Sequence, residues 1–200
     1  MQYHKSIIIF GSLLLTACTA SQPRKTHDIC DIFREKDDWY EYTDNTRKKW
    51  GVPIHVQMAI MQQESNFVAD AQPPRPYLLG FIPWFRKSSA YGYPQAQDGT
   101  WDWYTDKTGV WFADRDDFED ASDFVGWYCD VTYKTLGISK WNVSQQYLAY
   151  HEGHGGYKHK SYLKKPWLLK VSKKVDKRAR TYSLQLKKCK DEFKDTGWFF

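Results

Sequence analysis

The sequence predicts an all-α domain, and two observations indicate it. Apolar residues recur at intervals of three and four along several segments, the spacing that places them on one face of a helix. Glycine, proline and acidic residues stand where these segments begin and end. Strand-like alternation is missing outside one proline-rich segment, for which we expect a long loop or a small hairpin. With 200 residues and 42% hydrophobic content, the chain is long enough for one globular core.

The expected elements follow one another with short connections. In chain order, we expect one or two surface helices over 31–50, then helices over 53–65, 99–108, 118–136 and 145–152, and a long basic helix from 166 to 189. The residues expected at their ends are Gly51, Pro53 as the first helical residue, Asp98, Gly109, Asp116 or Asp117, Gly137, Ser144, Gly153 and Pro166.

The first residues are typical of a secretion signal. Lys5 precedes an apolar run over 7–15, which is too short to span a bilayer as a permanent helix. Residues 15–18 read Leu-Thr-Ala-Cys and resemble a bacterial lipobox. That resemblance implies cleavage before Cys18 and acylation of Cys18, with an ordinary signal peptide as the alternative.

This interpretation divides the chain into three parts. We expect a signal peptide at 1–17, a tether at 18–27 and the domain at 28–200. Thr19 stands after the lipidated cysteine, and the absence of Asp there favours sorting to the outer membrane. The resemblance therefore implies a periplasmic, lipid-anchored protein.

Three cysteines remain after Cys18. Cys129 falls on a helical apolar stripe and is interpreted as a small buried hydrophobe. Cys30 and Cys189 bracket nearly the whole domain, so we predict a disulfide between them, which an oxidising compartment permits. Closing so long a loop contributes about 4 kcal/mol in the chain-entropy treatment.

Glu64 is the strongest candidate for chemistry. It ends the 53–65 segment and continues the row of Val56 and Ile60 at i,i+4 spacing, so its carboxyl lies on an apolar stripe. Burial and the negative end of the helix dipole disfavour a carboxylate there, so we expect a raised pKa. A general acid near neutral pH needs such a pKa. The alternative is a Glu that turns out to solvent at a frayed helix end.

Three motifs support the catalytic interpretation. They are Glu64-Ser65, Ala-Tyr-Gly-Tyr-Pro-Gln at 90–95 and Leu-Ala-Tyr-His-Glu-Gly at 148–153. In this order they resemble the lytic transglycosylases with an SLT domain, relatives of goose-type lysozyme, and the resemblance covers roughly residues 51–157. Two departures stand out, since Tyr-Pro replaces Leu-Met in the second motif and His-Glu replaces Asn-Ala in the third.

The resemblance implies a lysozyme-like cleft and a peptidoglycan lytic transglycosylase. Such an enzyme cleaves the β-1,4 bond between N-acetylmuramic acid and N-acetylglucosamine and leaves a 1,6-anhydromuramoyl end. Glu64 would be the sole acid and base. No cofactor and no metal are implied, and the expected state is a monomer whose partners are peptidoglycan glycan strands.

Residue by residue, the motifs imply further roles. Ser65 would hydrogen-bond Glu64 or the substrate, Gln95 would bind an acetamido or hydroxyl group, and Tyr150 would hold the Glu64 carboxyl. Tyr91 and Glu152 are further candidates for substrate binding. Glu152 adds a second carboxyl beside Tyr150, which would raise the pKa of Glu64 further if the two are close. Structural roles at a helix end, in a turn and in the core remain the alternatives for Ser65, Gln95 and Tyr150.

The proline-rich segment 68–89 is longer than the corresponding gap in the resembled family. Its prolines exclude a helix. One interpretation is a lip beside the cleft that grips glycan through Tyr77, Trp84 and Phe85; the other is that these aromatics pack the segment onto the domain.

Other functions remain as alternatives. A hydrolysing lysozyme would use Asp98 or Asp102 to position water, and a lipoprotein could bind peptidoglycan without cutting it. A zinc peptidase would need the histidines of the third motif and its surroundings, but their spacing is not His-Glu-x-x-His. The formal charge of +5 permits anionic partners, although a secreted chain is not expected to meet nucleic acid.

Overall fold

The computed structural model describes residues 21–86 and 88–194. Within these ranges the elements are α1 (Ile29–Glu35), α2 (Asp37–Trp50), α3 (Ile54–Glu64), β1 (Tyr77–Leu78), β2 (Ile82–Pro83), α4 (Asp98–Thr108), α5 (Phe118–Leu136), α6 (Val143–Lys158) and α7 (Pro166–Cys189), with 3-10 turns at Ser161–Lys164 and Lys190–Phe193. The prediction of an all-α domain with a small hairpin is confirmed. None of the described helices has the length and apolar character needed to span a membrane.

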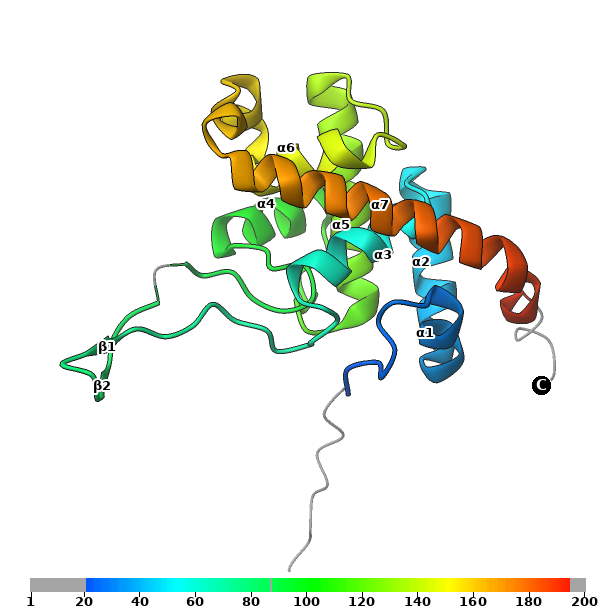
Figure 1. The fold of residues 1–200 in the computed structure, drawn as a ribbon, viewed down its shortest axis with the longest axis horizontal. Helices are drawn as coiled ribbons and strands as arrows, with labels where there is room; N and C mark the ends of the chain where they lie inside the picture. The colour runs from blue at the N-terminus through cyan, green and yellow to red at the C-terminus, as the bar shows by residue number, and fades with distance from the viewer. Residues whose placement is uncertain (1–20, 87, 195–200) are drawn as a thin grey trace, which may run out of the picture.

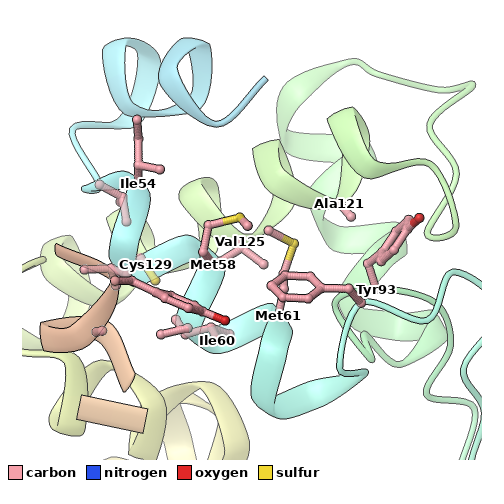
Figure 2. Packing of buried hydrophobic residues seen from close by; sticks show 14 of the residues in the cluster. Ile54, Met58, Ile60, Met61, Tyr93, Ala121, Val125 and Cys129 are labelled. Carbon is pink, nitrogen blue, oxygen red and sulfur yellow. The ribbon is translucent and has the colours of Figure 1, made fainter. Parts of the chain in front are cut away.

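Helix α3 lies at the centre of the fold. It is apolar on nearly all sides, and residues 56–62 are all buried, which is typical of a helix surrounded by others. Helices α2, α5 and α7 pack around it. Figure 2 shows Met58 and Met61 of α3 beside Val125 of α5, and in Figure 1 α7 crosses the bundle as one long rod. The surrounding helices thus fix the position of the last residue of α3, Glu64.

Several predicted helix ends are confirmed. The Asp117 carboxylate accepts a hydrogen bond from the Asp120 N–H at the start of α5, and Gly137 ends that helix in the left-handed conformation. Pro166 occupies the first turn of α7.

Other predicted ends are wrong by one or two residues. Pro53 immediately precedes α3 and is not its first helical residue. Gln97 precedes α4, since Asp98 already lies inside the helix, and the Asn142 side chain, not that of Ser144, caps α6. Helix ends shift easily because neighbouring polar residues compete for the same free N–H groups.

Two larger differences concern α2 and α6. The 31–50 segment forms two helices, and its Trp39 and Tyr40 are buried, so these helices are part of the core and not a surface layer. Helix α6 continues beyond Glu152 to Lys158, through a kink at Gly153, whose φ of 71° and ψ of 161° are not helical. The predicted helix end at Gly153 is thus present as this break, and a second helical segment follows it up to Lys158.

A disulfide joins Cys30 of α1 to Cys189 at the end of α7, across a sequence separation of 159 residues. This is the pair expected from the sequence. The free thiol of Cys129 is completely buried in α5.

The 77–85 hairpin stands away from the helical body (Figure 1). Tyr77 pairs with Pro83 and Leu78 with Ile82, and the turn between them places Leu79 and Gly80 at positive φ. Its aromatic side chains are exposed. The interpretation that they pack the segment onto the domain is therefore wrong.

The packing of α2 against α5 predicts the effect of one substitution. A Cβ at Gly126 of α5 would lie 2.3 Å from Cγ2 of Thr46 and 2.9 Å from Cδ1 of Trp50. We expect Gly126→Ala to lower the free energy of unfolding by about 1–3 kcal/mol, measured by urea denaturation, because the two helices must move apart. The matched control is Gly99→Ala in α4, where nothing lies within 4 Å of the added methyl. Equal stability of the two variants would contradict this packing.

Candidate active site

A cavity of about 460 Å³ lies against the end of α3. Its other walls are formed by residues of α4, α5 and α6 and of the segment that precedes α4. Its lining residues are Glu64, Ser88, Ala90, Gln95, Ala96, Gln97, Thr100, Phe124, Tyr128, Tyr150, His151, Glu152 and Gly153. The cavity therefore unites members of all three sequence motifs. Among the described lining residues there is no Lys or Arg.

Glu64 is partly accessible as a residue, but its Oε1 is buried and makes no hydrogen bond within the described chain. Burial raises the pKa of Glu64 from 4.5 to about 7, and a hydrogen bond from Tyr147 offsets only part of that rise. At neutral pH a substantial fraction of this carboxyl is protonated. A group that both holds and accepts a proton near pH 7 is suited to acid–base chemistry.

Tyr147, which none of the three motifs singles out, is the phenol whose hydrogen-bonding interaction lowers the pKa of Glu64. The predicted partner, Tyr150, donates its hydroxyl hydrogen to the carbonyl of Pro94 at 2.6 Å. Tyr150 still lines the cavity. Both residues lie on α6 three positions apart and so share a face of that helix, which is the signal that could have identified Tyr147.

Ser65 does not reach the Glu64 carboxyl. Its hydroxyl donates to the carbonyl of Met61 at 3.2 Å and accepts from the N–H of Phe67 at 3.1 Å. It is buried and does not line the cavity. Its position fits the structural alternative, a polar residue that ends α3 and turns the chain.

Gln95 lines the cavity, but its amide N–H groups are used within the protein. They donate to the carbonyls of Ala71 at 2.8 Å and Gly92 at 2.9 Å, which leaves Oε1 as the group that faces other partners. Gly92 does not line the cavity. Its φ is +74°, and a Cβ there would lie 2.1 Å from the carbonyl oxygen of Arg115, so the close approach is to backbone.

Tyr91 lies outside the cavity, contrary to its predicted place in the site. Its hydroxyl donates to the Asp116 carboxylate at 2.8 Å, and the Arg115 guanidinium lies over its ring at 5.5 Å. In the sequence, Tyr91 stands close to Gln95, which does line the cavity. The β-bridge between Tyr91 and Ala96 directs its side chain elsewhere.

Glu152 lines the cavity and is ionised. Its side chain is 3% exposed and accepts hydrogen bonds from Lys165 at 2.7 Å, Ser161 and His151. Burial alone would raise the pKa of Glu152, but these three donors outweigh it and hold the pKa below its usual range. Glu152 does not contribute to the raised pKa of Glu64, contrary to the sequence-based expectation.

The carboxylates named for a hydrolytic alternative lie elsewhere. Asp98 pairs with Arg115 at 2.9 Å, and neither Asp98 nor Asp102 lines the cavity. The histidines named for a zinc site do not come together. His151 of the third motif bonds Glu152, whereas His154, just after the motif, bonds the Thr132 hydroxyl at 2.8 Å. In the described part of the chain no three His, Cys, Asp or Glu side chains gather to hold a metal.

The apolar walls of the cavity were missed as site residues. Phe124 and Tyr128 of α5 line it, although an apolar stripe on a helix such as the one expected over 118–136 ordinarily belongs to the core. Both interpretations hold, because these rings are buried on one side and face the cavity on the other. Periodicity identifies an inward face but cannot tell where that face borders a hollow.

Comparison with protein families matches residues 6–189 to the family described as Transglycosylase SLT domain. The match covers most of the chain and extends well beyond residues 51–157, which carry the motifs. Neither the comparison with curated proteins nor that with solved structures found a match. The helical architecture agrees with this family and with the lysozyme-like fold expected from the motifs.

The raised pKa of Glu64 predicts how stability varies with pH. The folded protein holds the proton up to about pH 7, whereas the unfolded chain releases it near pH 4.5, so the folded state binds more protons between these values. Stability should therefore fall as pH rises through this window, by roughly 3 kcal/mol in total. Glu64→Gln cannot titrate, and its stability relative to the wild type should increase by that amount from pH 4 to pH 8 in urea denaturation. A difference that stays constant with pH would contradict a raised pKa.

The Tyr147 hydrogen bond lowers the pKa of Glu64, so Tyr147→Phe should raise it above about 7. The free energy of unfolding of Tyr147→Phe is compared with that of the double variant Tyr147→Phe/Glu64→Gln. The difference between these two should keep growing up to a higher pH than the difference between the wild type and Glu64→Gln. The matched control is Tyr150→Phe, which removes a hydroxyl bonded to Pro94 and should leave the window unchanged. A shift with Tyr150→Phe alone would reverse the two assignments.

Proposed function

We propose, from the premise that the chain belongs to the transglycosylase SLT domain family, that it is a peptidoglycan lytic transglycosylase with Glu64 as its only acid and base. The bond cleaved is the β-1,4 link between N-acetylmuramic acid and N-acetylglucosamine, and the product carries a 1,6-anhydromuramoyl end. The observation that carries the proposal is the Glu64 carboxyl in the cavity, whose buried Oε1 has no hydrogen-bond partner in the described chain.

The two carboxyls of the cavity differ in a way that supports one acid/base. Glu152 is ionised and held by Lys165, so a proton on it would cost that ion pair. Glu64 has no cation beside it and titrates near pH 7. A glycosidase that activates water generally needs a second carboxyl as base or nucleophile. A substrate hydroxyl as nucleophile removes this need.

The reaction then proceeds with one proton carrier. The Glu64 carboxylic acid protonates the glycosidic oxygen, and the bond from that oxygen to the muramoyl C1 breaks. The muramoyl C6 hydroxyl oxygen bonds to C1, and its proton passes to the Glu64 carboxylate, which restores the acid. Glu64 is unchanged over the cycle, and no water is consumed.

Other cavity residues would position the glycan. The Gln95 Oε1, which has no partner in the described chain, would accept a hydrogen bond from an acetamido N–H or a hydroxyl. The rings of Phe124, Tyr128 and Tyr150 would provide apolar contact with the sugar rings. Tyr147 would keep the Glu64 carboxyl directed and would limit how far its pKa rises.

We also propose a periplasmic location with a lipid anchor on Cys18. The support is the 15–18 lipobox and the apolar run before it. These residues, the predicted signal peptide and the first three residues of the predicted tether, 18–20, lie outside the described residues. Peptidoglycan would be within reach of a domain tethered in this compartment.

The experiment is digestion of peptidoglycan followed by mass spectrometry of the released fragments. Wild type should release fragments one water lighter than hydrolysis products, and Glu64→Gln should reduce the rate by at least about a hundredfold. The control is Glu152→Gln, which tests whether activity follows the other cavity carboxyl. Hydrated reducing ends would establish a lysozyme instead. Binding to peptidoglycan without cleavage by the wild type would leave a binding protein.

A further inference from the structure

The 77–85 hairpin presents an unusual concentration of exposed apolar side chains. The large apolar residues exposed on it are Tyr77, Leu78, Leu79, Phe81, Ile82, Trp84 and Phe85. Leu79 at the turn is 76% exposed and Phe85 81%. None of the seven lines the cavity. An exposed cluster of this kind marks a surface that binds something.

Apolar side chains lie on both faces of the hairpin and at its turn. Neighbouring residues along a strand point to opposite faces, and both Tyr77 and Leu78 of β1 are apolar, as are Ile82 and Pro83 of β2. The turn adds further apolar groups. A protein partner or a glycan strand would cover one face and leave the other in water. A hairpin that is apolar on both faces and at its tip fits a medium that encloses it, which is the interior of a lipid layer.

Part of the hairpin backbone is hydrogen-bonded within the hairpin itself. Phe81 N–H donates to the Leu78 carbonyl at 3.3 Å and Trp84 N–H to the Pro76 carbonyl at 2.8 Å. Pro76 and Pro83 carry no N–H at all. Leu79 and Gly80 at the turn donate no backbone hydrogen bond within the described chain, so these N–H groups need water or lipid headgroups as partners and insertion must be shallow.

The charges next to the hairpin are all of one sign. Arg75 and Arg86 flank it and are exposed, and the sequence contains no Asp or Glu between Asp70 and Asp98. The Arg86 Nε–H donates to the Pro73 carbonyl at 2.9 Å, which fixes its guanidinium at the base of the hairpin. Basic residues at this level complement anionic phosphates, and Trp and Tyr favour the boundary between lipid and water.

We propose that the 77–85 hairpin inserts into the outer layer of a bilayer containing anionic phospholipid and docks the domain on the membrane. Leu79 and Phe81 enter the acyl region, Tyr77 and Trp84 lie at the boundary, and the flanking arginines meet the phosphates. Two attachments hold a protein to a membrane far better than one. The proposal does not depend on the reaction proposed for Glu64.

An environment-sensitive fluorophore on the hairpin tests this directly. The full chain carries Cys18→Ser and Phe81→Cys and is labelled with a nitrobenzoxadiazole thiol reagent; Cys129 is buried and the other cysteines form the disulfide. Vesicles of phosphatidylcholine with phosphatidylglycerol should shift the emission to the blue and raise it several-fold, and spin-labelled lipid should quench it. Pure phosphatidylcholine should give a weaker response.

The matched control carries the same label at Phe112, an apolar residue that is 99% exposed in a different loop. Both chains share the same N-terminal residues, so attachment through that segment is common to both. Equal responses at the two positions, or no response at residue 81, would overturn the proposal. A response at residue 81 to soluble glycan strands but not to vesicles would identify a glycan lip instead.

A second variant keeps the test independent of the label. Leu79→Asp with Phe81→Asp should reduce co-sedimentation with the anionic vesicles by about tenfold or more, because two large apolar groups no longer enter the lipid. Unchanged thermal unfolding would verify that the domain remains folded. Unchanged co-sedimentation with a folded domain would contradict the proposal.

Discussion

The burial of one carboxyl at the end of the central helix is the constraint on which the rest of the structure depends. Helix α3 is surrounded by α2, α5 and α7, so its last residue cannot turn freely to solvent. Oε1 of Glu64 is left without a partner in the described chain, and desolvation moves its pKa to about 7. An unpaired buried polar atom costs stability. Keeping it is reasonable where chemistry uses the group, as at many catalytic sites.

The two cavity carboxyls illustrate how environment assigns roles. Glu152 is almost as enclosed as a core residue, yet Lys165, Ser161 and His151 keep it ionised. Glu64 has only one phenol donor, and with a pKa of about 7 about half of this carboxyl is protonated at neutral pH. Pairs of titratable groups whose pKa values are pushed apart indicate which is the acid. Here the charged carboxylate orders the residues after the α6 kink, and the neutral one faces the substrate in our proposal.

Local patterns predicted what depends on local physics. The stripes of α5 and α7 and the burial of the row that ends in Glu64 follow from periodicity alone. Hydrogen-bond directions in the site could not be predicted, because Tyr147 and Tyr150 lie on one helical face and only tertiary packing decides which reaches Glu64. The Ser65 hydroxyl likewise donates to the Met61 carbonyl and not to the neighbouring Glu64 carboxyl, which its place in the sequence does not reveal. The 77–85 hairpin is exposed because no element among the described residues covers it, and a local sequence pattern carries no information on such long-range contacts.

The most direct test of this account is the pKa of Glu64 in the folded wild-type protein. Carboxyl resonances of a sample labelled with ¹³C-glutamate can be followed by NMR from pH 3 to 9, and Glu64→Gln identifies the Glu64 signal by its loss. The account predicts a midpoint of about 7. A midpoint at or below the ordinary value of 4.5 would contradict the account, because the carboxyl would then be ionised at neutral pH and could not act as the acid.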